Sequence, residues 1–222
     1  MASKPKFVTL TGLDRLRDLD QAQKLSRLYP VEWGVLLARS RAGAKRYPEF
    51  ADAAEILQRA RAAGMMTAVH LCGSAAREFS EGQVRPDIAA RIVHAQRVQV
   101  NIAAPDDIHA TAQTVATTAK QFGVRAILQV RGAFPKKAPV DWLFDQSGGR
   151  GQEPMFWPTL TRSSGGFVGI AGGLGPENVG KVLAGLDVEG DFWIDMESRI
   201  RDESDNLCFE RCADVLRQAY PR

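Results

Sequence analysis

The sequence has little of what marks a secreted, metal-binding or polymer-binding protein. It contains three cysteines, Cys72, Cys208 and Cys212, which are too few for a disulfide framework. Cys208 and Cys212 lie four residues apart without the histidines that a zinc site would add. We therefore expect reduced thiols, no metal site and a cytoplasmic location.

Charge and hydropathy exclude two further classes of partner. The chain has 29 basic and 26 acidic residues, a net charge of +3, with the two signs interspersed, so no nucleic-acid-binding surface is predicted. No stretch approaches the roughly 18 uninterrupted apolar residues of a membrane span, and the N-terminus lacks the apolar segment of a signal peptide. We expect no nucleic-acid partner, no membrane partner, and a monomer or homodimer.

Short apolar runs alternate with helical patterns along the chain. Strands are predicted at Phe7–Thr11, Glu32–Ala38, Thr67–Cys72, Val98–Ile102, Ala126–Val130, Asp141–Asp145, Phe167–Ala171 and Phe192–Met196. Helices are predicted at Leu19–Leu28, Phe50–Ala63, Pro86–Ala95, Asp106–Phe122, Phe156–Arg162, Pro176–Ala184 and Leu207–Ala219. Eight units of about 25 to 30 residues favour the α/β class and a closed (βα)₈ TIM barrel over an open doubly wound sheet. No linker or low-complexity segment divides the chain, so residues 1–222 are interpreted as one barrel domain.

Polar and apolar residues alternate along several of these strands. Thr9 and Thr11 alternate with Val8 and Leu10, and the fourth, fifth and eighth strands follow the same pattern. One strand face then meets helices and the other meets polar surroundings, as at the carboxyl ends of barrel strands where ligands bind. An antiparallel sheet with one solvated face would also alternate, but it would not explain the intervening helices.

The segment GFVGIAGGLGPENVGKVL, residues 166–183, has the outline of an anion-binding loop. An apolar run ends in Gly172 and Gly173, and a helix-start signal follows at Pro176. Glycine backbone lets a ligand approach closely, and a helix beginning near Pro176 would direct its free N–H groups and positive dipole end toward that ligand. A tight turn that needs glycine only for positive φ is the alternative.

Polar residues expected to face inward near strand ends supply acid–base candidates. They are Thr11, Glu32, His70, Cys72, Asn101, Gln129, Arg131, Asp145, Asp195 and Glu197. We expect Asp145 to act as a general acid, because desolvation by its neighbours Trp142 and Phe144 would raise its pKa. His70 and Cys72 share a strand face, which leaves a metal pair or a nucleophile–base pair open, although no metal-ligand spacing supports the first. For any one of these side chains, a hydrogen bond to a loop amide is the alternative role.

Five segments follow the motif order of a known family. Residues 170–179, IAGGLGPENV, match the family's L-A-G-G-L-x-P-E-N-V, which is a specific motif. Four other motifs of the family correspond, in the same order, to residues 8–13 (VTLTGL), 45–48 (KRYP), 98–101 (VQVN) and 143–157 (LFD, then GGRGQ and FW). Over nearly its whole length, the chain resembles phosphoribosylanthranilate isomerase, a small (βα)₈ enzyme.

The resemblance implies an Amadori-type aldose–ketose isomerisation of a phosphorylated sugar derivative, with Asp145 as the general acid and no cofactor. The family's catalytic cysteine corresponds to Thr11, whose hydroxyl needs an activating base, so Glu32, His70 or Glu197 is the expected substitute. The implied phosphate- and substrate-binding residues are Arg46, Asn101, Gln129, Gly148, Gly149, Gly172, Gly173, Asp195, Ser198 and Arg199.

Two alternatives remain open at the level of sequence. Thr11 in place of cysteine is compatible with a paralogue that binds a phosphorylated metabolite without turning it over. Glu197 beside Asp195 is compatible with a metal-dependent lyase or epimerase on the same barrel. The first two hypotheses expect a small phosphorylated metabolite as the partner.

Overall fold

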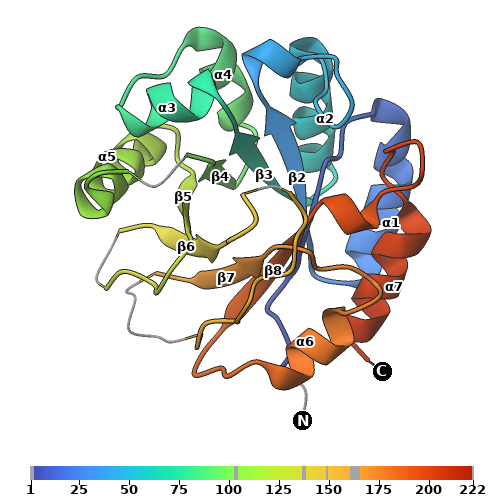
Figure 1. The fold of residues 1–222 in the computed structure, drawn as a ribbon. Helices are drawn as coiled ribbons and strands as arrows, with labels where there is room; N and C mark the ends of the chain where they lie inside the picture. Colours follow the sequence, from blue (N-terminus) through green and yellow to red (C-terminus); the bar gives the residue numbers. More distant parts are fainter. Residues whose placement is uncertain (1–2, 103–104, 137–138, 149, 161–165, 222) are drawn as a thin grey trace.

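The computed structural model describes residues 3–102, 105–136, 139–148, 150–160 and 166–221. Eight parallel strands close into a barrel in the order of the sequence, and helices surround it (Figure 1). The strands are β1 (Val8–Thr11), β2 (Val31–Leu37), β3 (Met66–Leu71), β4 (Arg97–Val100), β5 (Arg125–Val130), β6 (Asp141–Phe144), β7 (Val168–Ala171) and β8 (Phe192–Met196). The predicted (βα)₈ barrel is confirmed, and each strand lies within about two residues of its predicted position at either end.

Seven α-helices are formed by the described residues. They are α1 (Leu19–Leu28), α2 (Phe50–Ala62), α3 (Ser74–Ser80), α4 (Pro86–Ile92), α5 (Ile108–Gln121), α6 (Val179–Gly185) and α7 (Phe209–Ala219). Short 3₁₀ turns occupy Leu16–Asp18, Arg39–Arg41 and Ser198–Ile200. In the described parts of the β5–β6 and β6–β7 connections there is no α-helix, so the helical layer is interrupted beside β6 (Figure 1).

Three helix predictions differ from the structure. Residues 156–160 form no helix, and residues 161 and 162 of that predicted helix lie outside the described residues. Helix α3, after β3, was not predicted. Helix α6 begins at Val179 rather than Pro176, because the side chain of Asn178 accepts a hydrogen bond from the Gly175 N–H (2.9 Å) and holds residues 175–178 in a turn.

Strand alternation divides the apolar residues into two cores. Outward-facing strand residues pack with the helices into the larger core. Inside the barrel, the rings of Phe7, Phe167 and Trp193 contact one another, with the Trp193 centroid 6.1 Å from Phe7 and 5.0 Å from Phe167. Gly169 makes room for Trp193, since a Cβ at Gly169 would lie 2.3 Å from the Trp193 ring. These rings form the apolar floor below the carboxyl ends of the strands.

A buried charge cluster lies at the amino-terminal end of the barrel. The Arg97 guanidinium contacts Glu32 (3.1 Å) and Asp141 (3.3 Å), and it stacks 4.2 Å from the Trp193 ring centroid. Arg125 reaches the same Asp141 from a largely exposed position. The buried carboxylates of Glu32 and Asp141 thus share one buried cation, Arg97. Buried charges are tolerated in a protein when they are paired.

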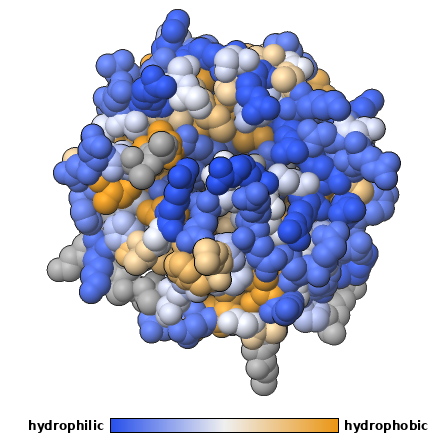
Figure 2. Space-filling view, in the orientation of Figure 1, coloured by the Kyte–Doolittle hydropathy of each residue, from blue (hydrophilic) through white to orange (hydrophobic). Residues whose placement is uncertain are grey.

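The surface carries few large apolar side chains. On the face seen in Figure 2, hydrophilic residues predominate and apolar residues form scattered patches. No helix within the described ranges combines the length and the apolar character needed to cross a bilayer.

The charge cluster predicts that substitution of Arg97 destabilises the protein much more than substitution of Arg125. Arg97→Met should lower the free energy of unfolding by about 3–5 kcal/mol, because it leaves Glu32 buried without a cation and Asp141 with only the largely exposed Arg125. Arg125→Met, whose side chain is 69% exposed, should cost about 1 kcal/mol or less. Urea unfolding of both variants checks this, and equal losses would contradict it.

Candidate functional site

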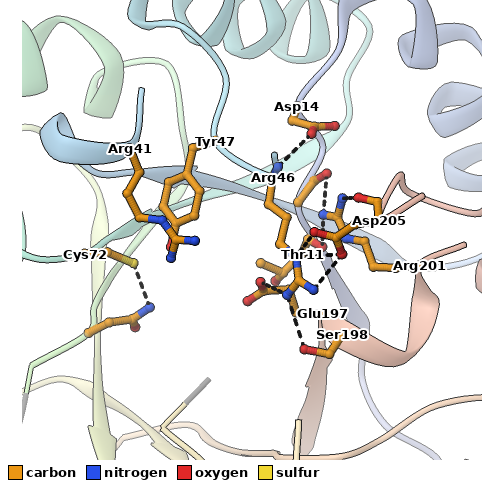
Figure 3. Close-up of polar contacts among 12 residues, drawn as sticks. Thr11, Asp14, Arg41, Arg46, Tyr47, Cys72, Glu197, Ser198, Arg201 and Asp205 are labelled. Carbon is orange, nitrogen blue, oxygen red and sulfur yellow. Dashed lines mark hydrogen bonds and ion pairs between the residues drawn. The ribbon is translucent and has the colours of Figure 1, made fainter. Parts of the chain in front are cut away.

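A pocket of about 610 Å³ opens at the carboxyl ends of the strands. Its walls are mainly polar, and they combine strand-end residues with the loops after β2, β5, β6, β7 and β8. This is the end of a (βα)₈ barrel at which ligands bind. Figure 3 shows part of the pocket, with Arg46 extending toward Glu197, Ser198 and Asp205.

Thr11 and Asp195 form a buried pair at the base of this pocket. The Thr11 hydroxyl donates a 2.7 Å hydrogen bond to Asp195 Oδ1 across the junction between β1 and β8. Arg201 fixes the end of β1 by donating to the Thr11 and Gly12 carbonyls. Gly12 allows this contact, because its φ is +101° and a Cβ there would collide with the Arg201 guanidinium.

The Asp195 carboxyl group holds its proton unusually strongly. Burial raises its pKa to about 8, and the carboxylates of Glu197, Glu32 and Asp145 add to the effect, while the hydrogen bond from Thr11 opposes it. A carboxyl group with a pKa near the working pH can both accept and release a proton. Asp195, which the sequence gave both as an acid–base candidate and as a binding residue, is therefore a candidate for proton transfer.

His70 lies on β3 beside the same pair and is 1% exposed. Its Nε2 has no hydrogen-bond partner among the described residues. Burial, with a smaller contribution from the positive charge of Arg97, lowers the His70 pKa to about 3. The imidazole is therefore neutral near pH 7.

Asp145 is positioned by the loop that follows β6. Its Oδ1 accepts hydrogen bonds from the N–H and the hydroxyl of Ser147, at 2.8 and 2.7 Å. The expectation that Trp142 and Phe144 surround this carboxyl group is wrong. Both rings pack in the outer core, on the strand face opposite to Asp145.

Arg46 links the loop after β2 to the loop after β8 (Figure 3). Its guanidinium makes a bidentate contact with Asp205 and donates to Glu197 Oε1 at 2.8 Å. Its backbone N–H donates to Asp14, and its φ is +72°. The hydrogen bonds to the two carboxylates raise the Arg46 pKa, and in this arrangement they also neutralise its charge.

Other cationic side chains line the pocket without carboxylate partners among the described residues. Arg41 lies 4.5 Å from the Tyr47 ring centroid and also donates to the Tyr47 hydroxyl. Arg131 and Arg199 line the opposite part of the wall. Because none is neutralised by an ion pair, these guanidinium groups are the better candidates for binding an anionic ligand.

The loop after β7 has positive φ angles at Gly172 (+110°) and Gly173 (+60°). A Cβ at Gly173 would lie 2.5 Å from the Glu153 backbone nitrogen, so close backbone packing alone accounts for glycine there. The helix that follows, α6, starts later than expected and has seven residues. Its dipole therefore does not indicate an anion-binding site. The N–H groups of Gly173 and Leu174 nevertheless have no acceptor among the described residues.

The pocket brings together most of the residues that the sequence singled out. It is lined by Arg46, His70, Asn101, Gln129, Asp145, Gly148, Gly172, Gly173, Asp195, Glu197, Ser198 and Arg199, and Thr11 lies directly beneath it. Gly149 lies outside the described residues.

Glu32 is the exception among the candidate bases. It faces inward as predicted, but it belongs to the charge cluster at the opposite end of the barrel, bound to Thr9 and Arg97. The predicted strand begins at Glu32, so its place at the amino-terminal end could have been recognised from the sequence. We therefore no longer consider Glu32 a candidate base.

Sequence reasoning also missed Arg41, Tyr47, Gln99 and Asp205. Gln99 follows the same alternation as Asn101 and donates to it at 3.0 Å, so the pattern could have identified it. Arg41, Tyr47 and Asp205 lie in loops, where no periodicity predicts the direction of a side chain.

The raised Asp195 pKa predicts a specific dependence of stability on pH. Between pH 4 and about 8, the folded chain keeps a proton that the unfolded chain has released, so this group makes stability fall as pH rises. Asp195→Asn should remove up to about 1.4 kcal/mol per pH unit of this slope. Urea unfolding from pH 5 to 8 checks it, with the exposed Asp191→Asn as the control; identical slopes in wild type and Asp195→Asn would contradict it.

Comparison with known proteins places this geometry on a familiar fold. No family model matches the chain, and no curated protein matches it. Among solved structures, N-(5'-phosphoribosyl)anthranilate isomerase from Pyrococcus furiosus superposes with a TM-score of 0.62 at 19% identity, covering 96% of this chain and 98% of that one. For 3-keto-L-gulonate-6-phosphate decarboxylase from Vibrio cholerae, the TM-score is 0.54 at 13% identity, with 98% of both chains covered.

A variant of the tryptophan synthase α-subunit from Pyrococcus furiosus is similar over 97% of this chain and 99% of its own, with a TM-score of 0.51 at 12% identity. At these identities the likeness concerns the fold, and activity has to be argued from the site. The chain thus has a (βα)₈ barrel fold like that of phosphoribosylanthranilate isomerase.

Proposed function

We propose that this protein is an isomerase that converts a phosphorylated aldose derivative into the corresponding ketose by an Amadori-type rearrangement. The observation that carries the proposal is the placement of two carboxyl groups, Asp145 and Asp195, in one pocket from β6 and β8. The raised pKa of Asp195 fits one of them for proton transfer near neutral pH.

In the proposed reaction Asp145 is the general acid. It donates a proton to the ring oxygen of the N-substituted sugar, the bond between C1 and that oxygen breaks, and the nitrogen lone pair forms an iminium group. Ser147 holds the carboxyl group in place through two hydrogen bonds to Oδ1. Such fixed geometry contributes to catalysis because the acid does not have to be ordered during the reaction.

Asp195 acts as the base. Its ionised form takes the proton from C2 of the iminium intermediate, which gives an enaminol that becomes the 1-amino-2-ketose when C1 gains a proton and the C2 hydroxyl loses one. Thr11 stabilises the ionised form by donating to Oδ1. In this scheme Thr11 is a positioning residue, and Asp195 takes over the role that the resemblance gave to a cysteine.

The anionic part of the substrate would be bound at the rim. The N–H groups of Gly173 and Leu174 and the side chains of Arg131 and Arg199 are available for a phosphate group. This assignment supports a phosphorylated substrate.

A second hypothesis, binding of a phosphorylated metabolite without turnover, has one observation in its favour. Arg46 is held by Glu197 and Asp205 across the pocket mouth, so a cation that the resemblance assigns to substrate is already paired. The metal-dependent alternative has none, since no three His, Cys, Asp or Glu side chains in the described ranges could hold a metal ion.

The first prediction of the proposal concerns turnover of phosphoribosylanthranilate, followed by loss of its fluorescence. The wild type should convert it, and Asp145→Asn and Asp195→Asn should each lower kcat by at least about 100-fold, the usual contribution of an acid or a base. Asp191→Asn, an exposed carboxylate far from the pocket, is the matched control. Tight binding without product by the wild type would instead support the metabolite-binding hypothesis.

The second prediction concerns the pH dependence of kcat. Because the base must be ionised, activity should rise as pH passes through about 8 in the wild type. Thr11→Val removes the hydroxyl that favours the ionised carboxylate, so the rise should move to higher pH, whereas Thr11→Ser should leave it in place. An unchanged profile in Thr11→Val would exclude this role for Thr11.

A further inference from the structure

The loop after β2 carries three arginines, and they differ in what they contact. Arg39 is paired with Glu78 and Asp87, each at 2.9 Å, outside the residues that line the pocket. Arg46 is paired with Glu197 and Asp205. Arg41 lines the pocket, and none of the described carboxylates forms an ion pair with it. It is therefore the cation of this loop that remains available to a ligand.

The Arg41 guanidinium is held in place by Tyr47. It lies 4.5 Å from the Tyr47 ring centroid, and its Nη1 donates to the Tyr47 hydroxyl at 3.4 Å. Tyr47 is 7% exposed and packs with Leu36 and Ala38 in a small core of its own. Figure 3 shows the Arg41 side chain extending along the Tyr47 ring. A cation that is oriented before the ligand arrives loses less conformational entropy on binding.

The surroundings of Arg41 indicate which anion it would bind. One guanidinium compensates one negative charge, and its planar fork matches the two oxygens of a carboxylate. Leu36, Tyr47 and Cys72 belong to the same small cluster and also line the pocket, so partly apolar surface lies next to the cation. An apolar group that bears a single carboxylate fits this part of the pocket better than a phosphate dianion does.

The proposed reaction defines which part of the substrate lies there. With C1 and C2 of the sugar at Asp145 and Asp195, the 5-phosphate binds at the rim near Gly173 and Arg199. The substituent on the sugar nitrogen is attached to C1, at the other end of the sugar. It therefore extends toward the loop after β2, where Arg41 lies.

We propose that Arg41 is a specificity-determining residue that binds a carboxylate on the substituent of the sugar nitrogen. Arg46, which the resemblance assigns to substrate binding, instead ties the loop after β2 to the loop after β8. This inference rests on the proposed function, because that function places the sugar and its phosphate.

The test uses two stable ribitol 5-phosphates that carry an N-aryl-amino group at C1 and cannot isomerise. The aryl group is 2-carboxyphenyl in one and phenyl in the other, so the probes differ only in the carboxylate. Calorimetry should show the wild type binding the carboxylate probe about 10- to 100-fold more tightly, the range that a charge-assisted hydrogen-bonded pair supplies. In Arg41→Gln this ratio should fall to about one. Affinity for the phenyl probe should stay the same, which shows that the pocket is intact.

Two matched comparisons separate Arg41 from the charge around it. Arg39→Gln removes the same charge from the same turn and should leave the ratio unchanged. Arg41→Lys and Arg46→Lys both keep the charge and lose the planar fork. The ratio should fall several-fold in Arg41→Lys and stay as in the wild type in Arg46→Lys.

Four outcomes would overturn the inference. They are an unchanged ratio in Arg41→Gln, an equal loss in Arg39→Gln, loss of the ratio in Arg46→Lys with its retention in Arg41→Lys, and equal binding of the two probes by the wild type. Each of them leaves the proposed isomerisation standing, because turnover does not require a carboxylate on the substituent. Failure of both probes to bind contradicts the sugar-phosphate substrate itself, and the inference falls with it.

Discussion

The pairing of β1 with β8 is the constraint on which the rest of this structure depends. It closes the barrel, with Val8 beside Ile194 and Leu10 beside Met196, and it joins residues that are more than 180 positions apart in the sequence. The same pairing brings the Thr11 hydroxyl to Asp195. A packing requirement, closure of the sheet, thus produces the hydrogen bond to Asp195, which opposes the rise of its pKa to about 8 on burial.

Two polar layers lie at opposite ends of the barrel, separated by apolar side chains. At the amino end, Arg97 compensates Glu32 and Asp141. At the carboxyl end, Arg46 is paired with Glu197 and Asp205. The two ends are electrostatically coupled, since Glu32 helps to raise the Asp195 pKa and Arg97 helps to lower the His70 pKa.

Much of this architecture could be predicted from the sequence, for local physical reasons. Short apolar runs between helical patterns located every strand, and alternation in the first, fourth, fifth and eighth strands indicated which residues face the interior. Helix α1 was predicted with its observed bounds. Helix α3 was not, since it has seven residues and no side-chain cap. The start of α6 was misplaced because Asn178 stabilises a turn that the Pro-Glu-Asn sequence does not distinguish from a helix start.

The sequence predicted which residues form the pocket better than it predicted their protonation and their contacts. The glycines at 172 and 173 and the aspartates at 145 and 195 stand at strand ends, where periodicity and motif order both point to them. The raised pKa of Asp195 depends on burial and on charges from other strands, and the burial of His70 Nε2 depends on the closed barrel around β3. Neither property can be predicted from the order of residues along the chain. The ion pair between Arg46 and Asp205 likewise depends on two loops that meet only in the folded chain.

Isotope exchange tests the central claim most directly. The protein is incubated with phosphoribosylanthranilate in D₂O, and the product is analysed by mass spectrometry and proton NMR. If carboxyl groups move the proton as we propose, solvent deuterium appears at C1 of the aminoketose as the substrate is consumed. Recovery of unchanged substrate, with no deuterium at C1 or C2, would contradict the account and identify the pocket as one that binds without catalysing proton transfer.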